Sequence, residues 1–127
     1  MRNEKLNILV VEDNHDNREV ISLFIRGSAS LDFATNGEEA LVKTDRNLYD
    51  IILMDINLGA GMDGIAVTQE IRKMPIYSDT PIIAVTAYAM NSDKERFLSG
   101  GCSHYLAKPF ARQEILKLIL PLLTLKI

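Results

Sequence analysis

The stretch YDIILMDINLGAGMDG (residues 49–64) joins an apolar run to a glycine-rich loop through a single carboxylate. The run at 51–54, IILM, has the length and β-branched content of a strand. It is apolar without alternation, which is typical of strands covered on both faces of a sheet. Asp55 follows directly, and three glycines lie between positions 59 and 64. We therefore expect Asp55 at the mouth of a site, where its role depends on which other groups reach the same place.

Length and composition predict one soluble domain over residues 1–127, since 47% of the residues are hydrophobic and 24% are charged. The net charge of −3 predicts no direct binding to nucleic acid or to an anionic membrane. The single cysteine, Cys102, excludes an intramolecular disulfide and fits a reducing compartment. No signal peptide is recognisable, and the longest apolar stretch, 115–125, is too short for a bilayer. We therefore expect a cytoplasmic protein.

Strand-like runs alternate along the chain with segments of helical period. The expected strands are residues 6–11, 31–34, 51–54, 82–86 and 105–107. The first helical signal is the spacing i, i+3 and i+4 of Val20, Leu23 and Phe24, and the second is an Asn36 cap with Glu39. The third helix contains Val67, Ile71 and Met74 and ends at Pro75, and the fourth has a capping box of Ser92 with Glu95 and a stop at Gly100 and Gly101. The last helix is expected over about 111–120. Successive βα units imply an α/β fold with a doubly wound parallel sheet and right-handed crossovers.

Polar groups follow four of the expected strands at the point where each strand ends. Because parallel strands present their carboxyl ends at one edge of the sheet, these groups should share one crevice. They are Glu12 and Asp13, then Asp55, then Thr86 and Ala87, then Lys108 and Pro109. Each has an ordinary explanation: Asp13 could cap a helix, Lys108 could be solvated, and Thr86 could simply favour a strand. Those explanations must hold separately at four strand ends, so we favour a shared site.

The set of groups suits phosphoryl chemistry. Three nearby carboxylates repel one another, and a hard cation such as Mg²⁺, which takes about six oxygen ligands, relieves the repulsion. A dianionic phosphoryl group then becomes tolerable, because Lys108 can neutralise one of its oxygens and Thr86 can donate a hydrogen bond. The small side chain of Ala87 leaves its backbone N–H approachable. A carboxylate is a competent nucleophile for phosphorus, and Asp55 is the candidate because its strand is central.

In these residues the chain resembles the receiver domains of two-component response regulators, such as chemotaxis regulators. The matching motifs occur in the family's order over essentially the whole chain. They are ILVVEDN, IILMDI, MDGI, PIIAVTAYA and YLAKPF. The resemblance implies a flavodoxin-like fold, in which five helices flank a five-stranded parallel sheet of order 2-1-3-4-5.

The resemblance also implies a role for each site residue. Asp55 would accept a phosphoryl group from a histidine kinase or a histidine phosphotransfer protein, and the domain would slowly hydrolyse its own aspartyl phosphate without being a turnover enzyme. Asp13, Asp55 and the backbone carbonyl of Asn57 would bind Mg²⁺ (or Mn²⁺), and Glu12 would act on the ion through water. The other implied roles are contact of Lys108 with the phosphoryl group, a cis bond between Lys108 and Pro109, a switch of Thr86, Ala87 and Tyr105, and modulation of the phosphoryl lifetime by Asn57 and Tyr88.

Three features depart from the family pattern. The loop INLGAGMDG is one residue longer than usual and lacks the usual Pro, so the position of the Asn57 carbonyl does not follow from the pattern. Ala111 stands where a capping Asp or Thr is common, which weakens the start of the last helix by about 1 kcal/mol. That helix is also too apolar for all its leucines and isoleucines to face one core. Either Pro121 breaks it and the tail folds back, or Leu118, Leu122 and Leu123 line a partner or dimer surface.

The output of such a domain depends on what lies beyond it. A complete chain would be a single-domain regulator, whereas a chain cut from a longer protein would look most like the receivers of hybrid kinases. The downstream target is not readable from the sequence. A homodimer would use the face formed by the helix at 92–99, the strand at 105–107 and the last helix.

Three other functions share parts of this pattern. A flavodoxin-like cofactor binder would need a hydroxyl- and glycine-rich loop where VVEDNHDN offers carboxylates. A haloacid-dehalogenase-type, Mg²⁺-dependent phosphatase would need a second Asp at Asn57 and a longer chain for a substrate cap. A phosphorylation-independent protein-binding module would normally have lost Asp55 or Lys108, and both are present. Turnover of a phosphate monoester would favour the phosphatase, and failure to incorporate acetyl phosphate would favour the module.

Overall fold

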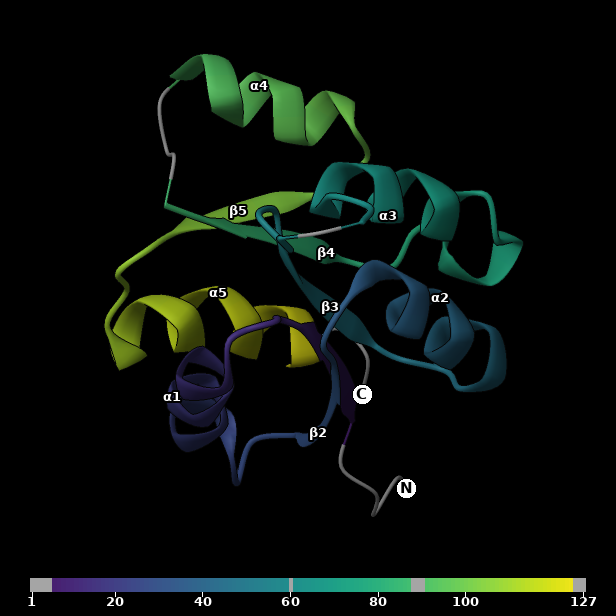
Figure 1. Cartoon of the computed structure of the whole chain (residues 1–127). Helices are drawn as coiled ribbons and strands as arrows, with labels where there is room; N and C mark the ends of the chain where they lie inside the picture. Colours follow the sequence, from purple (N-terminus) through teal and green to yellow (C-terminus); the bar gives the residue numbers. More distant parts are fainter. Residues whose placement is uncertain (1–5, 60, 88–90, 125–127) are drawn as a thin grey trace.

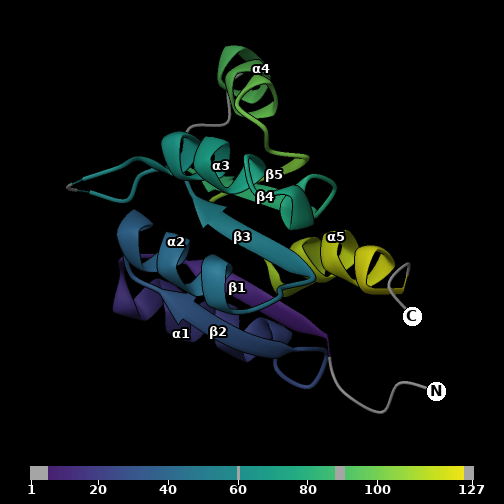
Figure 2. The same ribbon diagram turned by 90° about the vertical axis from the view of Figure 1, so that its right-hand side faces the viewer.

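A computed structural model describes residues 6–59, 61–87 and 91–124, without the side chains of residues 91 and 92. In this part of the chain, five parallel strands form one sheet in the order β2-β1-β3-β4-β5. Helices α1 and α5 cover one face, and α2, α3 and α4 cover the other (Figure 1 and Figure 2). The elements are β1 (Asn7–Val11), α1 (His15–Ile25), β2 (Ser30–Ala34), α2 (Gly37–Arg46), β3 (Ile51–Asp55), α3 (Gly64–Arg72), η1 (Pro75–Tyr77), β4 (Ile82–Thr86), α4 (Asn91–Ser99), β5 (His104–Ala107) and α5 (Arg112–Thr124). The predicted fold class and strand order are confirmed.

The central strand β3 is buried on both faces, as its unbroken apolar sequence predicts. Ile52 and Met54 belong to the hydrophobic cluster under α2, α3 and α4, whereas Ile51 and Leu53 belong to the cluster under α1 and α5. Burial of one such side chain contributes about 2 kcal/mol. The apolar run therefore fixes β3 at the centre of the molecule, with Asp55 at its carboxyl end.

Helix α1 forms as expected, but its buried face is not the stripe that the sequence marks most clearly. Ile21 and Ile25 are the buried residues of this helix, and Phe24 packs partly against the same cluster. Val20 and Leu23 are 42% and 54% exposed. Because successive residues turn by about 100° around a helix, a shift of one position rotates the apolar stripe away from the sheet.

Helix α5 runs unbroken to Thr124 with Pro121 inside it, so the expectation of a break at Pro121 is wrong. Leu123 is only 6% exposed, and Leu118 and Leu122 pack partly against the α1–α5 cluster. The alternative that all three leucines line an exposed patch is therefore wrong for Leu123, whereas Leu118 and Leu122 are half-buried. Burial of Leu123 contributes about 2 kcal/mol, which offsets much of the cost of a proline near the helix end.

The helix ends show which capping predictions hold. Asn36 caps α2 by accepting a hydrogen bond from the Glu39 N–H at 2.8 Å. At α5, where Ala111 offers no cap, the Glu114 carboxylate accepts a hydrogen bond from the Ala111 N–H at 2.9 Å. Helix α3 ends at Arg72, earlier than the expected stop at Pro75, which instead begins η1. The side chain of Ser92, and with it the expected capping box of Ser92 and Glu95, lies outside the described residues.

Candidate functional site

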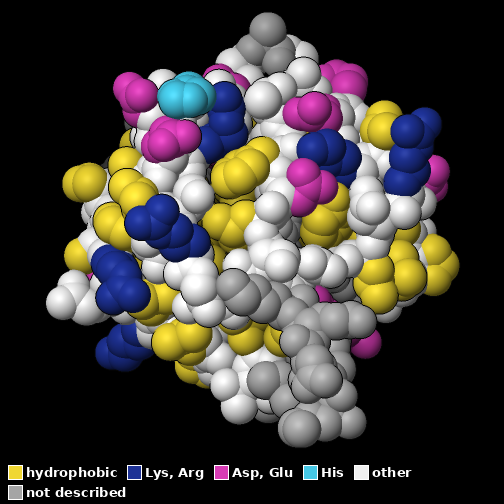
Figure 3. All heavy atoms as spheres, turned by 90° about the horizontal axis from the view of Figure 1, so that it is seen from below, with side chains coloured by type: hydrophobic (Ala, Val, Ile, Leu, Met, Phe, Trp, Pro, Cys, Tyr) yellow, Lys and Arg dark blue, Asp and Glu magenta, His cyan; other side chains and the backbone are white. Residues whose placement is uncertain are grey.

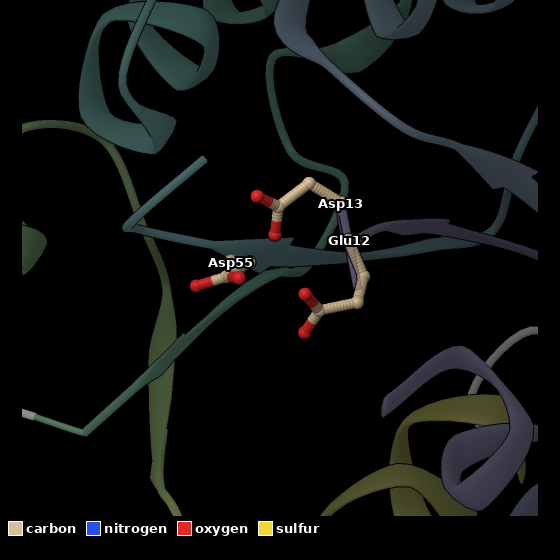
Figure 4. A group of neighbouring side chains, drawn as sticks. All are labelled: Glu12, Asp13 and Asp55. Atoms are coloured by element: carbon tan, nitrogen blue, oxygen red, sulfur yellow. The ribbon is translucent and has the colours of Figure 1, made fainter. Parts of the chain in front are cut away.

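Three carboxyl groups meet at the carboxyl edge of the sheet (Figure 4). Glu12 and Asp13 follow β1 directly, and Asp55 is the last residue of β3. The two strands are neighbours whose register pairs Val11 with Met54, so the three acids come to the same place. Each acid offers a carboxylate oxygen, and these oxygens all lie within 4.8 Å of one another.

The three acids differ in burial and in hydrogen bonding. Glu12 and Asp55 are 1% and 4% exposed, whereas Asp13 is exposed. The Asn14 N–H donates to Glu12 Oε2 at 3.1 Å, and the Asn57 N–H donates to Asp55 Oδ1 at 3.0 Å. The backbone therefore orients two buried carboxylates, and Asp13 closes the site on the solvent side. Asp13 is not the N-cap of α1, because the side chain that caps this helix is that of Asn14.

Lys108, which follows β5, reaches both buried carboxylates. Its Nζ lies 3.1 Å from Glu12 Oε1 and 3.4 Å from Asp55 Oδ2. Burial on its own lowers the pKa of Lys108, but the carboxylates of Asp55 and Glu12 outweigh that effect, so the pKa is raised. Lys108 is therefore a protonated ammonium at the site over the whole physiological range.

The acids still outnumber the single ammonium group of Lys108. Partial removal of the Asp13 carboxyl from water raises its pKa. A hydrogen bond to Glu12 and the negative charge of Glu12 raise this pKa further. A divalent cation would relieve this crowding, and carboxylate oxygens at this spacing are the ligands that Mg²⁺ prefers. The residues present thus fit a hard divalent cation.

The ends of β4 and β5 complete the edge. Thr86 is fully buried at the end of β4, and its carbonyl accepts a hydrogen bond from the Lys108 N–H at 2.8 Å. Ala87 is exposed and, with Glu12 and Lys108, lines a hollow of about 430 Å³. The peptide bond between Lys108 and Pro109 is cis. The structure therefore brings Thr86, Ala87 and Lys108 to the same edge as the acids.

The hollow continues past the acids between α1 and the loop after β5. Asn17, Val20 and Phe110 line it; Phe110 ends the motif YLAKPF, whereas Asn17 and Val20 belong to no motif that the sequence marks as functional. The sequence signal for this part of the hollow is Val20, an apolar residue on the outer side of α1.

The surface seen from below carries apolar side chains scattered among charged ones (Figure 3).

Tyr105 lies in β5, which β4 separates from the Asp55 strand β3. It is half-buried and packs against the cluster under α2, α3 and α4. The Lys94 Nζ lies 4.6 Å from the centre of its ring, within the range of a cation–π contact. Tyr88, the expected modulating residue, lies outside the described residues.

Together, the parallel sheet of order 2-1-3-4-5 and the lysine-bearing acidic pocket at its carboxyl edge define a flavodoxin-like α/β domain with a candidate cation site. The sequence profile of the response regulator receiver domain matches residues 8–120. The chain belongs to this family, and thus to two-component signal transduction.

Relatives of the chain include both a histidine kinase and a response regulator. The signal transduction histidine-protein kinase BarA of Escherichia coli strain K12 is 34% identical over 116 residues, which cover 91% of this chain and 12% of BarA. The polar-differentiation response regulator DivK of Brucella anthropi is 38% identical over 105 residues, which cover 82% of this chain and 85% of DivK. The chain thus spans only about an eighth of the length of BarA.

One similar solved structure contains a metal ion in its active site. The receiver domain of the sensor histidine kinase PA1611 from Pseudomonas aeruginosa PAO1 has a magnesium ion coordinated in its active-site cleft. It is 37% identical to this chain, with a TM-score of 0.86, and the match covers 94% of this chain and 98% of that one.

In the described residues of our chain, no helix combines the length and the apolar character that a bilayer crossing requires.

Proposed function

We propose that residues 1–127 form one phosphoacceptor domain of a phosphorelay and that Asp55 takes the phosphoryl group. The observation that carries the proposal is the position of the Asp55 carboxylate. It lies at the end of the central strand, clustered with Glu12 and Asp13, and its Oδ2 is 3.4 Å from the Lys108 Nζ. Its Oδ1 is held by the Asn57 N–H. A nucleophilic oxygen is thus oriented next to a cation that can balance incoming negative charge.

The transfer follows from this geometry. An oxygen of Asp55 attacks the phosphorus of a phosphohistidine, the new P–O bond forms, and the P–N bond breaks. The electron pair of that bond stays with the ring nitrogen, and a phosphohistidine that carries a proton on its other ring nitrogen leaves as a neutral imidazole. Lys108 neutralises one phosphoryl oxygen, Thr86 donates a hydrogen bond to another, and the Ala87 N–H is available to the same group.

A divalent cation supports this chemistry. Bound Mg²⁺ would supply the positive charge that balances the acids and the phosphoryl oxygens. Asp13, Asp55 and the backbone carbonyl of Asn57 would hold it directly, and Glu12 would act through water. Mn²⁺ would serve in its place. The carboxylate cluster and the magnesium ion of the PA1611 receiver support this assignment.

The phosphoryl donor is a histidine kinase or a histidine phosphotransfer protein. The kinase name of BarA supports a donor of this class. The match to a small part of BarA supports a receiver within a hybrid kinase, whereas the match to most of DivK supports a single-domain regulator. In either setting we place the domain in the cytoplasm.

The signal leaves the site through Thr86 and Tyr105. A phosphoryl group adds about −1.5 to −2 charge and three acceptor oxygens, which attract the Thr86 hydroxyl. Movement of Thr86 makes room for the Tyr105 ring to turn inward, away from its present contact with Lys94. The altered face of α4, β5 and α5 would then bind a downstream protein or a second copy of the chain.

The alternatives are less well supported by the site. Asn57 stands where a phosphatase of the haloacid-dehalogenase type would need its acid, so we propose self-hydrolysis of the aspartyl phosphate without turnover. The intact Asp55–Lys108 contact gives no reason to favour a phosphorylation-independent module.

Labelling with acetyl phosphate and Mg²⁺, followed by mapping of the phosphorylated residue, tests the proposal. The parent protein should be labelled on Asp55, and Asp55→Asn should not be labelled. Stoichiometric labelling of Asp55→Asn would disprove the assignment of the acceptor. Steady turnover of a phosphate monoester would instead support the phosphatase, and no labelling of the parent would support the binding module.

A further inference from the structure

The loop after β3 is held at its base, and Gly59 within it lies near Asp13. Ile56 and Leu58 are both 3% exposed and belong to the hydrophobic cluster under α2, α3 and α4. The Gly64 N–H donates to the Ile56 carbonyl at 3.0 Å, which closes the loop. Because Leu58 is buried, the next residue, Gly59, cannot move far outward without pulling Leu58 from the core.

Gly59 lies against the exposed metal-ligand candidate. Its φ is +76°, in the left-handed region that favours glycine, and an added Cβ would lie 3.3 Å from Asp13 Oδ2. That separation is tight for a carbon–oxygen contact, so the Asp13 carboxylate would have to yield by a few tenths of an ångström. A side chain at Gly59 would therefore press on the Asp13 carboxylate where it stands in the acid cluster.

We propose that Gly59 is a positioning residue for the cation site, and that it keeps Asp13 where a small, geometrically demanding cation such as Mg²⁺ can be bound. The inference rests on the proposed function, since it concerns the same site. Mg²⁺ requires near-ideal octahedral geometry at about 2.0–2.1 Å, whereas Ca²⁺ accepts flexible geometry at about 2.3–2.6 Å. A displaced Asp13 should therefore harm Mg²⁺ binding more than Ca²⁺ binding.

Two other glycines provide matched controls. Gly61 has φ +90° and would place a Cβ 3.4 Å from Glu38 Oε1, on a different carboxylate. Gly27 has φ +91° and open space around its missing Cβ. All three glycines are exposed, so alanine at each position brings a similar backbone strain. Only the substitution at Gly59 brings a contact with Asp13.

The experiment compares Gly59→Ala, Gly61→Ala and Gly27→Ala by calorimetric titration with Mg²⁺ and with Ca²⁺, after circular dichroism has checked their folding. Gly59→Ala should bind Mg²⁺ about tenfold more weakly than the parent, a typical effect of disturbing a residue that orients a ligand. Its Ca²⁺ affinity should change less. The two control variants should keep the Mg²⁺ affinity of the parent.

A double-mutant cycle separates positioning from general damage. In an Asp13→Ala background, Gly59→Ala should have no further effect on Mg²⁺ affinity, because the ligand that it displaces is gone. The inference would be overturned if Gly59→Ala bound Mg²⁺ as tightly as the parent, or if all three alanine variants lost Mg²⁺ affinity equally. It would also be overturned if Gly59→Ala lost as much affinity for Ca²⁺ as for Mg²⁺. A parent that binds no Mg²⁺ at all would overturn the proposed metal site as well, so the two failures are distinguishable.

Discussion

Replacement of Lys108 by methionine tests the electrostatics of the site most directly. The ammonium lies 3.1 Å from Glu12 and 3.4 Å from Asp55, whose side chains are only 2% and 5% exposed. At these separations each attraction amounts to about 5 kcal/mol before the cost of desolvation is subtracted. The variant Lys108→Met keeps the apolar stem but leaves two buried carboxylates without their cation.

The net effect on stability is smaller than the sum of the two attractions. Removal of one partner from a buried pair costs about 3–5 kcal/mol. Because the Lys108 side chain is 23% exposed and partly screened by water, we expect Lys108→Met to lose about 2 kcal/mol of unfolding free energy without metal. Binding of Mg²⁺ at about one hundred times its dissociation constant adds about 2.7 kcal/mol to any protein that binds it only when folded. The variant should gain more than the parent, since no ammonium competes for its carboxylates.

Urea unfolding followed by circular dichroism, in EDTA and in saturating Mg²⁺, measures both effects. The deficit of Lys108→Met should appear in EDTA and shrink in Mg²⁺. A suitable control is Lys73→Met, since Lys73 pairs with Glu70 on the surface at 2.7 Å and its side chain is 72% exposed. The control should lose less than about 1 kcal/mol and be insensitive to Mg²⁺. A Lys108→Met variant that is as stable as the parent in EDTA, or whose deficit Mg²⁺ leaves unchanged, would refute the reasoning.

Three further experiments test other parts of the molecule. Calorimetric titration of Asp13→Ala should show a larger loss of Mg²⁺ affinity than that of Glu12→Ala, and the reverse order would mean that Glu12 is the direct ligand. Thr86→Ala should still be labelled by acetyl phosphate but should lose most phosphorylation-dependent NMR shifts on the face of α4, β5 and α5; shifts identical to the parent's would disprove the coupling. Burial alone would raise the pKa of Asp32, but hydrogen bonds from Tyr49 and a neighbouring lysine lower it, so its stabilising effect is present above about pH 4 and is lost as the pH falls further. In urea unfolding, Tyr49→Phe should therefore cost about 1 kcal/mol near pH 7 and progressively less below about pH 4, and a cost independent of pH would count against this link.

The sequence alone determined the fold class and which residues meet at the carboxyl edge of the sheet. The run IILM has no polar residue and NILVV has one, at its exposed start, which is typical of strands that are covered on both sides and favours a doubly wound sheet. A parallel sheet then brings the ends of its strands to one edge whatever the details of packing. For this reason Glu12, Asp13 and Asp55 could be placed together before any distance was known.

The tertiary structure alone decided the contacts among residues that are far apart in the chain. Pro121 breaks an isolated helix, but burial of Leu123 against the α1–α5 cluster keeps α5 intact through it. Lys108 is 96 residues from Glu12 and 53 from Asp55, yet one ammonium group serves both carboxylates. The room for a Cβ at Gly59 is likewise limited by Asp13, which follows a strand end in another part of the chain. Local sequence patterns fix which groups reach the edge of the sheet, but their separations depend on how the helices and loops pack, and that packing is a property of the whole chain.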